Sequence, residues 1–388
     1  MVKNWEVLRS ISPWKKPFHL LRAQLARFWI KRFSKVEVIA ITGSVGKTTA
    51  KEAIFQVLGT KFNVLKTIEN FDPIFNIPET LLSVRSKTQK VVLEMGVEYP
   101  GEMDFYLSQV KPRIGVVTQI SWAHTEFFKD IDGVLTEKSK MVKVLPENGW
   151  AVLNWDDLNV RSLAKETCAK IFRFGSNSKV CDLWLENFKQ DFSGSQFSIS
   201  KKGKTRKVSW DLVGRQNAIS ALAAASVGLI CGLEMEEICQ ALSRFQIQKS
   251  RMLIRRMGRN LIILDDCYNS SPLAAKTALE TLNELSVGKR KIAVLGDMLE
   301  LGTFSKRAHQ ELGEEVVKNN VDLLFSLGEN SKATVEVAKK VLGKKARWFK
   351  SKETLINKLN LEVKKGDVIL VKGSRAMNLE KVIEKIKL

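Results

Sequence analysis

The sequence has few features of a secreted or membrane-spanning protein. Its five cysteines are scattered and form no C-x-x-C pair, which excludes a disulfide or zinc framework and indicates a reducing compartment. No uncharged apolar run approaches the roughly 18 residues that a transmembrane helix needs. The N-terminus also lacks the apolar run and the small-residue cleavage site of a signal peptide. We therefore expect a cytoplasmic protein.

Proline is also scarce, with 8 residues among 388, and repeats and low-complexity tracts are absent from the sequence. Hydrophobic residues make up 44% of the chain and charged residues 27%. This composition is typical of a globular protein that buries sizeable cores, so it excludes disordered and fibrous architectures. The length predicts two or three domains.

Acidic residues are in the minority, and the net charge of +21 at first favours an anionic partner such as nucleic acid, membrane or a phosphorylated substrate. The excess is uneven, because residues 1–35 hold nine bases and one acid, and residues 339–388 hold fifteen bases and five acids. The middle of the chain is therefore nearly neutral. A groove for nucleic acid would spread its charge across the fold, so we expect no nucleic-acid partner.

The basic N-terminal segment has helical periodicity. Over residues 17–33, apolar side chains recur at helical spacing while the bases fall largely outside that stripe, which predicts a basic amphipathic helix. The stripe consists of Phe18, Leu21, Leu25, Phe28 and Trp29. Two interpretations stay open: the helix packs on the fold with its basic face in solvent, or residues 1–33 attach the protein to the inner face of an anionic membrane.

The remainder of the chain alternates short β-branched runs with helical patterns, which predicts an α/β fold with largely parallel sheets. Residues 181–212 interrupt this rhythm and predict a β-hairpin with a turn at Gly203. A domain boundary is expected near residues 246–250. The predicted strands are 36–41, 91–94, 114–118, 151–153, 261–264, 292–295, 323–327 and 368–371, and the helical patterns include 215–231, 273–285 and 305–319.

A phosphate-binding loop follows the first of these strands. Gly43 and Gly46 allow a tight turn that aims backbone N–H groups at phosphate oxygens, and a helix begins directly afterwards. Lys47 can neutralise the β- and γ-phosphates, and the Thr48 hydroxyl can bind Mg²⁺. We therefore expect nucleotide binding here. The predicted binding residues in this loop are Thr42, Gly43, Ser44, Gly46, Lys47, Thr48 and Thr49.

Three residues beyond the loop are candidates for the same site. Glu94 ends a predicted strand, where α/β folds place ligands, and a carboxylate beside a phosphate loop is a natural Mg²⁺ ligand. His124 lies just past another strand end and is one of three histidines in the chain. Lys138, judged by its neighbours in the sequence alone, is an ordinary solvated helix lysine.

Taken in order, the motifs of this sequence resemble those of the Mur ligase family, from about residue 36 to the C-terminus. The nearest resemblance is to the branch that adds D-alanyl-D-alanine to the muramoyl tripeptide of peptidoglycan precursors. The phosphate loop has the family's shorter spacing, and Glu137-Lys138 fits the stretch with the family's carbamylated lysine. The other matching strings are 94–96, 100–102, 118–124, 214–217, 251–252, 265–272, 294–302 with His309 after it, and 371–377.

The resemblance implies a central P-loop ATPase domain with a mostly parallel sheet at 36–247 and a C-terminal Rossmann-like α/β domain at 248–388, after the basic segment 1–35. It implies ATP-dependent amide-bond formation for cell-wall biogenesis through an acyl phosphate. The implied cofactors are ATP and Mg²⁺, the latter at two sites. The implied small-molecule partners are a muramoyl-peptide-like acceptor and D-alanyl-D-alanine or an amino acid.

The resemblance also implies roles for individual residues. The implied catalytic residues are Lys47, His124, Lys138 and Arg251. The implied metal ligands are Thr48, Glu94, His124 and Lys138, with Lys138 carbamylated so that it offers an anionic oxygen. Asn217 is implied to contact adenine and Asp266 the ribose, while Lys372, Ser374 and Arg375 approach when the C-terminal domain closes.

The chain also departs from the family pattern, mainly on the substrate side. Only about 35 residues precede the first strand, where the family has a domain that grips the UDP-sugar, so we expect that domain to be lacking. Near the acceptor, Asp72, Pro73 and Asn76 replace Asn, Asn and Gly. The remaining departures are Gln119 and Ser121 before His124, Lys140 in place of Glu, and Lys249-Ser250 before Arg251.

These departures leave other functions open. A ligase of the same family could add amino acids to a different acid, as folylpolyglutamate and cyanophycin synthetases do. A catalytically altered homologue could bind nucleotide without ligating. The string Gly-Asp-Met-Leu-Glu-Leu-Gly at 296–302 favours the D-alanyl-D-alanine branch, and the presence of Lys47, Glu94, His124 and Lys138 favours an active enzyme.

Overall fold

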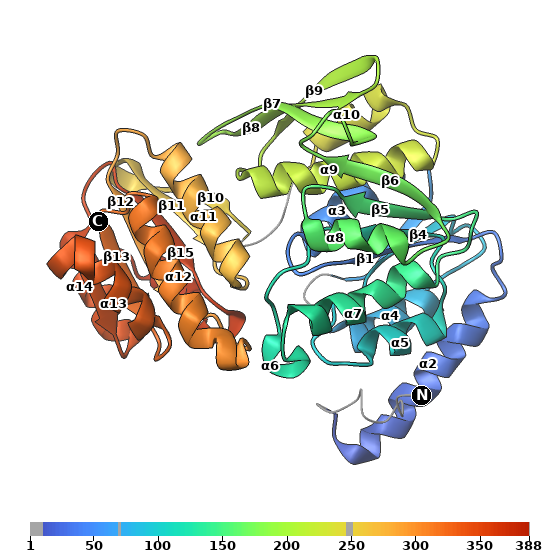
Figure 1. The fold of residues 1–388 in the computed structure, drawn as a ribbon, viewed down its shortest axis with the longest axis horizontal. Helices are drawn as coiled ribbons and strands as arrows, with labels where there is room; N and C mark the ends of the chain where they lie inside the picture. Colours follow the sequence, from blue (N-terminus) through green and yellow to red (C-terminus); the bar gives the residue numbers. More distant parts are fainter. Residues whose placement is uncertain (1–10, 69–70, 246–250, 388) are drawn as a thin grey trace.

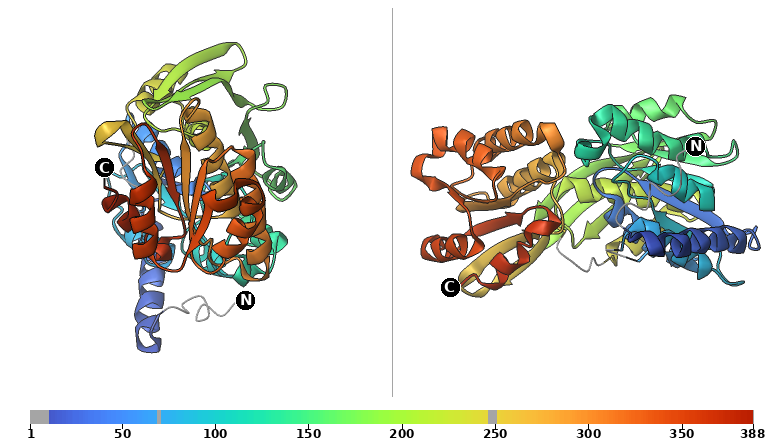
Figure 2. Two further views of the ribbon diagram at one scale, coloured as in Figure 1. Left: turned by 90° about the vertical axis from the view of Figure 1, so that its left-hand side faces the viewer. Right: turned by 90° about the horizontal axis from the view of Figure 1, so that it is seen from below.

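The computed structural model describes residues 11–68, 71–245 and 251–387. They form two β-sheets that lie side by side, each flanked by helices, as expected for an α/β protein (Figures 1 and 2). Sequence reasoning places a domain boundary at 246–250, which lies outside the described residues. The last described helix before that gap is α10 (Met235–Ser243), and the first strand after it is β10 (Leu253–Met257).

The first sheet has nine strands in the order β2-β3-β1-β4-β5-β6-β7-β8-β9, and it is parallel from β2 to β7. Its central strands are apolar throughout because both faces are covered. In β1, for example, Ile39 and Ile41 belong to one core, while Val38 and Ala40 belong to the other. The strand bounds are β1 Glu37–Thr42, β2 Val64–Lys66, β3 Lys90–Glu94, β4 Ile114–Val117, β5 Trp150–Asn154 and β6 Lys170–Gly175.

Different helices cover the two faces of this sheet (Figure 1). The side chains of α3 (Lys47–Gly59), α9 (Arg215–Ile230) and α10 pack in one core. The other core receives side chains from α2 (Lys16–Ile30), α4 (Pro73–Leu82), α5 (Glu102–Gln109), α6 (Thr125–Phe128), α7 (Ile131–Lys143) and α8 (Leu158–Ser162). The helix predicted after the phosphate loop is confirmed as α3, whose Ala53, Ile54, Val57 and Leu58 are fully buried.

The segment predicted as a hairpin contains three strands. β7 (Leu183–Asp191), β8 (Gly194–Lys201) and β9 (Lys204–Trp210) pair antiparallel and extend the first sheet. The predicted turn at Gly203 is confirmed, with φ of 79° between β8 and β9. A second turn before Gly194 produces the additional strand.

The second sheet has six strands in the order β10-β11-β15-β12-β13-β14, all parallel except β10. Its strands include β11 (Leu261–Asp266), β12 (Lys291–Gly296) and β15 (Val368–Lys372), each within two residues of the predicted bounds. Their side chains divide between two cores on opposite faces. The other elements are β13 Leu323–Leu327, β14 Ala346–Phe349, α11 Pro272–Leu285, α12 Ser305–Lys318, α13 Ser331–Leu342, α14 Lys352–Glu362 and α15 Glu380–Glu384.

The predicted N-terminal helix is confirmed as α2, but its orientation differs from the simplest expectation. It packs on α4 through Ala23, Ala26 and Ile30, which are buried. The apolar stripe that sequence periodicity identified points to solvent for most of its length. The two alanines of the buried face allow α2 and α4 to approach more closely than the larger side chains of the stripe would. Within the described ranges, we find no helix that is long and apolar enough to cross a membrane.

Candidate functional site

The phosphate loop lies at the carboxyl end of β1, between β3 on one side and β4 on the other. The chain order reverses at this position, which is where open α/β sheets bind ligands. Gly43 and Gly46 have φ of 146° and 85°, a region that favours glycine. A Cβ atom at Gly43 would also collide with the Thr118 hydroxyl. Both glycines are therefore required by the loop's conformation.

The strand end at Thr118 holds the phosphate loop in place. The Thr118 hydroxyl donates to Val45 O over 2.7 Å, and the Ser44 hydroxyl donates to Ser121 O over 3.0 Å. The Ser44 N–H donates to Gln119 O over 2.5 Å. These contacts explain why Gln119 and Ser121 preserve the loop despite their departure from the family pattern, because the backbone rather than the side chain accepts each bond.

A hydroxyl and a carboxylate meet beside the loop. The Thr48 hydroxyl, in the first turn of α3, donates to Glu94 Oε1 at the end of β3 over 2.9 Å. Mg²⁺ binds oxygen ligands at about 2.1 Å in an octahedron, whose adjacent ligands lie about 3 Å apart. The spacing of these two oxygens therefore fits two neighbouring positions around one Mg²⁺ ion.

Two lysines of α3 lie close to this pair. Lys47 donates to Ser44 O over 3.3 Å, and burial lowers the pKa of its amine, with Arg251 opposing protonation and Glu94 favouring it. Lys51 is fully buried, and its Nζ atom lies 3.5 Å from Glu94 Oε2 and 3.2 Å from Glu52 Oε1. Sequence reasoning missed Lys51. The only signal in the sequence is that Lys51 falls on the face of α3 that packs on the sheet, where a lysine is unexpected.

Arg251 comes from the second half of the chain and reaches the phosphate loop. Its Nη2 atom lies 3.0 Å from the Thr48 hydroxyl, and its guanidinium lies over the Tyr268 ring, 4.1 Å from the ring centre. The Arg375 guanidinium lies 6.0 Å from the centre of the same ring. The structure thus brings Arg251 to the predicted nucleotide site, with Tyr268 as a neighbour that the sequence did not identify.

Asp266 and Lys372 form a second cluster at the neighbouring carboxyl ends of β11 and β15. The Lys372 amine donates to Asp266 Oδ2 over 2.6 Å and to Asn269 O over 2.9 Å. Asp266 also accepts the Met252 N–H over 3.2 Å. Since Met252 follows Arg251 directly, this bond links the cluster to the residue that contacts Thr48.

The remaining nucleotide-side predictions fall into two places. Asn217 begins α9, where its amide donates to Val213 O over 2.8 Å. The same end of α9 is close to the phosphate loop, because a Cβ atom at Gly46 would lie 3.0 Å from the Ser220 hydroxyl. Ser374 accepts the Leu299 N–H over 2.9 Å, so its hydroxyl holds the loop after β12.

His124 bridges the two halves of the molecule. Its Nδ1 atom lies 2.5 Å from Glu300 Oε2, and the Glu126 N–H donates to Glu300 O over 3.1 Å. His124 lowers the pKa of the Glu300 carboxyl through this contact. Among the described residues, no hydrogen bond or ion pair joins His124 to Glu94 or Thr48. In this structure the residues predicted for the second metal site therefore do not contact one another directly, and His124 is paired with Glu300 instead.

Glu98 is an additional carboxyl near His124 that sequence reasoning missed. Burial raises its pKa, while the nearby His124 and Lys47 charges lower it. Its position four residues after Glu94 gave no signal, because the segment between them is neither helix nor strand. Glu98 therefore adds a carboxyl that interacts electrostatically with both Lys47 and His124.

Lys138 is buried on α7, contrary to its solvated character in the sequence alone. Burial lowers the pKa of its amine well below the ordinary value, and the Lys47 charge acts in the same direction. Glu137 and Glu102 oppose that shift. Burial raises the pKa of the Glu102 carboxyl to about 7. The site thus contains a lysine that loses its proton more readily than usual.

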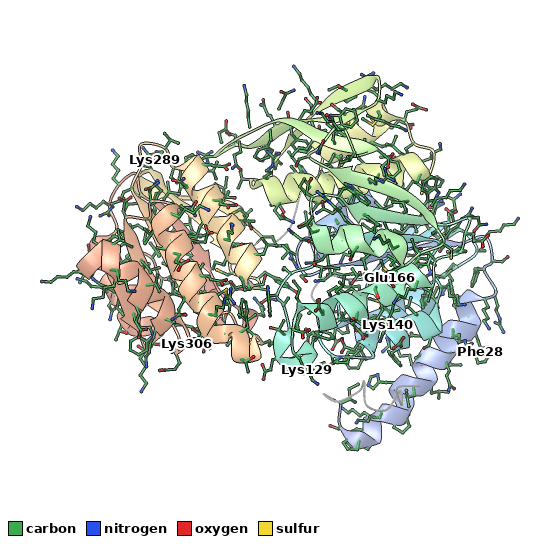
Figure 3. All side chains as sticks on the ribbon, in the orientation of Figure 1. Phe28, Lys129, Lys140, Glu166, Lys289 and Lys306 are labelled. Carbon is green, nitrogen blue, oxygen red and sulfur yellow. The ribbon has the colours of Figure 1, made fainter. Side chains whose placement is uncertain are left out.

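Lys140 occupies a position where the family has Glu. It forms ion pairs with residues of α7 and α5, which cover the same face of the first sheet. Its amine donates to Glu137 Oε2 over 2.6 Å and to Asp104 Oδ2 over 2.7 Å. Figure 3 labels Lys140 on α7. Glu137 in turn accepts the Gly101 and Met103 N–H groups over 3.0 and 2.9 Å. Lys140 therefore anchors α7 to α5.

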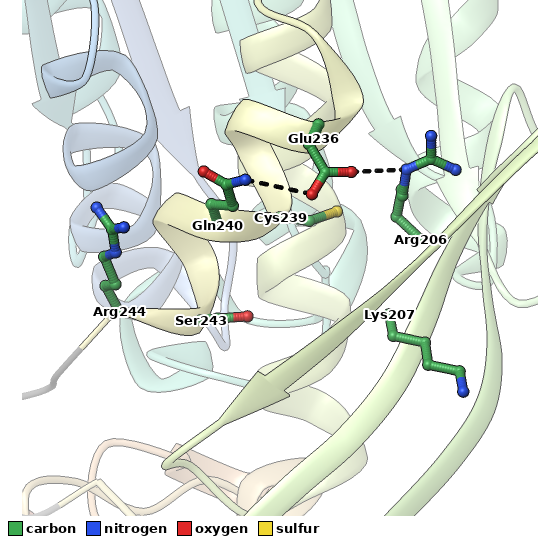
Figure 4. Close-up of a pocket in the computed structure, with 7 residues that line it drawn as sticks. All are labelled: Arg206, Lys207, Glu236, Cys239, Gln240, Ser243 and Arg244. Atoms are coloured by element: carbon green, nitrogen blue, oxygen red, sulfur yellow. Dashed lines mark hydrogen bonds and ion pairs between the residues drawn. The ribbon is translucent and has the colours of Figure 1, made fainter.

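A pocket between β9 and α10 lies apart from this site (Figure 4). None of the predicted site residues lines it. Its principal contacts are an ion pair of Arg206 with Glu236 at 2.8 Å and a hydrogen bond from Gln240 to Glu236 at 3.3 Å. The lining residues are Arg206, Lys207, Glu236, Cys239, Gln240, Ser243 and Arg244.

The chain matches two models of protein families. The Mur ligase middle domain matches residues 41–228. The Mur ligase, glutamate ligase domain matches residues 244–375. Both matches include residues of the site described above.

Similar sequences and structures agree with these matches. The UDP-N-acetylmuramoyl-tripeptide--D-alanyl-D-alanine ligase of Bacillus subtilis is 31% identical over 93% of this chain and 78% of its own length. The ligase of the same name from Escherichia coli is 31% identical over 92% of this chain and 78% of its length. A MurF crystal structure from Acinetobacter baumannii has a TM-score of 0.87 and 25% identity, over 95% of this chain and 80% of that one. The MurF ligase of Thermotoga maritima in complex with ADP has a TM-score of 0.84 and 28% identity, over 95% and 83%.

Proposed function

Because this chain belongs to the Mur ligase family, we propose that it is an ATP-dependent ligase that adds D-alanyl-D-alanine to a muramoyl tripeptide in peptidoglycan precursor synthesis. The names of its relatives support this substrate pair. The observation that supports the activity most directly is the meeting of Thr48, Glu94 and Arg251 beside the phosphate loop. This arrangement offers oxygen ligands for a cation and positive charge for a phosphate.

We assign the nucleotide to the carboxyl end of β1. The backbone of residues 42–49 and the amino end of α3 would hold the phosphates. Lys47 and Arg251 would offset the charge that develops on the transferred phosphoryl group. Thr48 and Glu94 would hold one Mg²⁺, which supplies charge neutralisation at the phosphates when it is bound.

A second cation is assigned to Glu94, His124 and Lys138. Only a neutral amine attacks CO₂, and burial favours the neutral form of Lys138. The product, a carbamate, would offer anionic oxygen in place of a repelling ammonium. In the present arrangement His124 contacts Glu300, so a bound cation would compete with Glu300 for the imidazole.

The ligation takes two steps. An oxygen of the acceptor carboxylate attacks the γ-phosphorus of ATP, ADP leaves, and an acyl phosphate forms. The amine of the incoming dipeptide then attacks the carbonyl carbon, inorganic phosphate leaves, and the nitrogen loses a proton. The protein's main contribution is alignment of the two reactants and stabilisation of charge.

We further propose that residues 36–247 and 248–388 act as two domains that close over the nucleotide. Asn217 would contact adenine and Asp266 the ribose. Lys372, Ser374 and Arg375 would approach with the second domain. The contact of Arg251 with Thr48 supports this closure, because it joins the two halves at the phosphate loop.

The location of the protein is also a proposal. We propose that it works in the cytoplasm and that residues 1–33 touch the inner face of an anionic membrane. The described part of that segment, residues 11–33, has six bases and no acid, which supports the assignment. A peripheral contact needs no membrane-spanning helix.

Phosphate release from ATP tests the ligase activity. We expect release that requires both UDP-muramoyl tripeptide and D-alanyl-D-alanine, and little release with either one alone. Lys47→Ala should lower the rate by about 10³-fold or more, because it removes a charge aimed at the transferred phosphoryl group. The exposed Lys87→Ala serves as control and should keep the wild-type rate. Release with a different acid and amino acid, but not with this pair, would contradict the substrate assignment.

A further inference from the structure

Helix α2 presents an apolar stripe to solvent. Four of its large side chains, together with Trp14 just before the helix, fall within about 80° of one another at 3.6 residues per turn. Isolated exposed apolar residues are normal, but a continuous stripe of this kind marks an interaction surface. The exposed fractions are 69% for Trp14, 69% for Phe18, 54% for Leu21, 51% for Leu25 and 64% for Phe28. We call these five residues the outer stripe.

The outer stripe is not the surface that attaches α2 to the fold. Ala23, Ala26 and Ile30 form the buried face, on the opposite side of the helix. The attachment is reinforced by an ion pair of Arg22 with Glu79 at 2.8 Å and by a hydrogen bond from Trp29 Nε1 to Val84 O at 3.0 Å. Packing on the fold therefore leaves the outer stripe unexplained. Figure 2 (left) shows the helix extending beyond the rest of the molecule, and Figure 3 labels Phe28 on it.

Bases flank the outer stripe on both sides. On a helical projection, Lys15 and Arg22 fall on one side and Arg27 and Lys31 on the other. Lys31 lies 5.9 Å from the Phe28 ring centre, and Lys15 lies 4.9 Å from that of Trp14. An apolar strip edged by lysine and arginine fits the boundary between acyl chains and anionic headgroups.

The charge also decides between a bilayer and a second copy of this chain. Residues 11–33 contain six bases and no acid. A symmetric dimer built on the outer stripe would bring the same patch of each copy together and oppose like charges. An anionic bilayer supplies both the apolar layer and the compensating charge.

The same helix is connected to the active site through α4. The His19 ring packs edge-on against Phe75, with 4.6 Å between ring centres. Pro73, the first residue of α4, and Lys47 both face Gly96, because a Cβ atom there would lie 3.7 Å from Pro73 Cγ and 3.5 Å from Lys47 Cε. Phe75 lies two residues from Pro73 in α4, so α4 joins the N-terminal half of α2 to the site.

The substrate side of the site is therefore connected to the helix that carries the outer stripe, through the opposite face of that helix. We call residues 71–78, which the family resemblance places near the acceptor, together with the proposed second-cation ligands His124 and Lys138, the acceptor side. We propose that the outer stripe docks the protein on an anionic phospholipid bilayer and holds the acceptor side at its surface, where the acceptor is a muramoyl peptide carried on a membrane lipid. This inference rests on the proposed ligase function for the acceptor, but the docking does not.

Vesicle sedimentation tests the docking. The probes are vesicles of phosphatidylcholine alone and of phosphatidylcholine mixed with phosphatidylglycerol. The full chain should sediment with the anionic vesicles, and changing Phe18, Leu21, Leu25 and Phe28 to serine should lower the affinity by roughly 100-fold or more. The matched control changes four exposed apolar residues elsewhere, Leu158, Val287, Val341 and Leu361, to serine and should bind like wild type.

Three results would overturn the docking. The first is equal sedimentation of the stripe variant and wild type. The second is equal binding of both variants below wild type, which would mean that any loss of apolar surface has this effect. The third is that wild type binds no vesicles but forms a dimer in sedimentation velocity without lipid, and that the stripe variant, unlike the control variant, is a monomer. Thermal unfolding of both variants verifies that each is folded.

A ligation assay with two acceptors tests the second half of the proposal. One acceptor is a muramoyl tripeptide on a polyprenyl lipid in anionic vesicles, and the other is the soluble UDP-linked form. We expect the stripe variant to lose roughly 10-fold or more on the lipid-linked acceptor and to match wild type on any soluble turnover. Wild-type turnover of the soluble acceptor only would overturn the lipid assignment. No turnover of either acceptor would contradict the proposed ligase function. The docking on the bilayer would still be tested independently by vesicle sedimentation.

Discussion

The nucleotide side of the site, formed by residues 42–49 with Glu94 and Arg251, differs from the acceptor side in how completely the protein builds it. On the nucleotide side, Thr48 contacts both Glu94 and Arg251 at hydrogen-bonding distance, and backbone groups hold the loop. On the acceptor side, His124 contacts Glu300, and among the described residues no hydrogen bond or ion pair joins it to the buried Lys138. The comparison teaches that the proposed ATP site is built at the carboxyl end of the first sheet. The proposed acceptor side depends instead on loops that link the two halves of the chain.

Among the residues outside the phosphate loop, the largest effect is expected at Arg251, which completes the nucleotide side from the second half of the chain. Arg251→Ala should lower kcat by about 10²- to 10³-fold, because a guanidinium aimed at the phosphate position is lost. The kcat of Arg251→Lys should fall between those of wild type and Arg251→Ala, because lysine keeps the charge but loses the planar contact with Tyr268. Steady-state phosphate release measures both.

Arg256 provides the control for this prediction. It lies on β10 close to Arg251 in the sequence, and its guanidinium donates to Phe192 O over 2.8 Å, away from the phosphate loop. Arg256→Ala should leave kcat near the wild-type value. Equal losses for the two alanine variants would mean that Arg251 acts only through the stability of this segment.

The sequence was sufficient to predict the phosphate loop of the nucleotide side because the parts of that loop are local. A strand, two glycines, Lys47 and Thr48 follow one another, so their spacing alone predicts the loop. The partners of His124 and Arg251 could not be deduced this way, since Glu300 and Tyr268 are distant in sequence and reach the site only through the second sheet. The burial of Lys138 is likewise a tertiary property.

Three of the strands that sequence reasoning missed have a common cause, whereas β6 (Lys170–Gly175), which was also missed, lies inside the first sheet. β2 and β14 lie at sheet edges, and β10 is an edge strand with arginines at two of its positions. Edge strands lack the continuous apolar runs of buried parallel strands, so their pattern is weak. For α2, periodicity correctly predicted a helix but not which face is buried, because the packed face uses two alanines and Ile30 rather than the larger residues.

An intermediate effect is expected at Lys138, where function and stability should move in opposite directions. Lys138→Met should lower kcat by about 10²-fold, since the carbamate ligand cannot form, and should stabilise the fold by about 1–3 kcal/mol, since a buried amine is replaced by an apolar chain. Thermal unfolding in CO₂-depleted buffer and phosphate release measure the two effects. Lys143→Met, on the same helix but half-exposed, is the control for both.

The pH dependence of Lys138 has a definite sign. Its folded pKa lies below the unfolded value, so between the two values the unfolded state binds more protons, and wild-type stability rises with pH. The advantage of Lys138→Met should therefore be greatest below the folded pKa and shrink as the pH rises towards about 10.4, the unfolded pKa. Lys138→Ala should regain part of its activity with added short carboxylates. A stable, fully active Met variant would contradict the proposed role.

The smallest effect is expected where the acceptor side departs from the family pattern. Asp72 begins α4 by accepting the Ile74 N–H over 2.9 Å, and asparagine caps helices about equally well. Asp72→Asn, which restores the family residue, should change stability by no more than about 0.5 kcal/mol and kcat/KM for the acceptor by less than about threefold. Asp72→Ala should cost about 1 kcal/mol through loss of the cap. Asp72→Asn could instead switch the preference between lipid-linked and UDP-linked acceptors by tenfold or more. This position would then select the acceptor directly, and the acceptor side would differ from the family through Asp72 rather than through helix α2, which packs on α4.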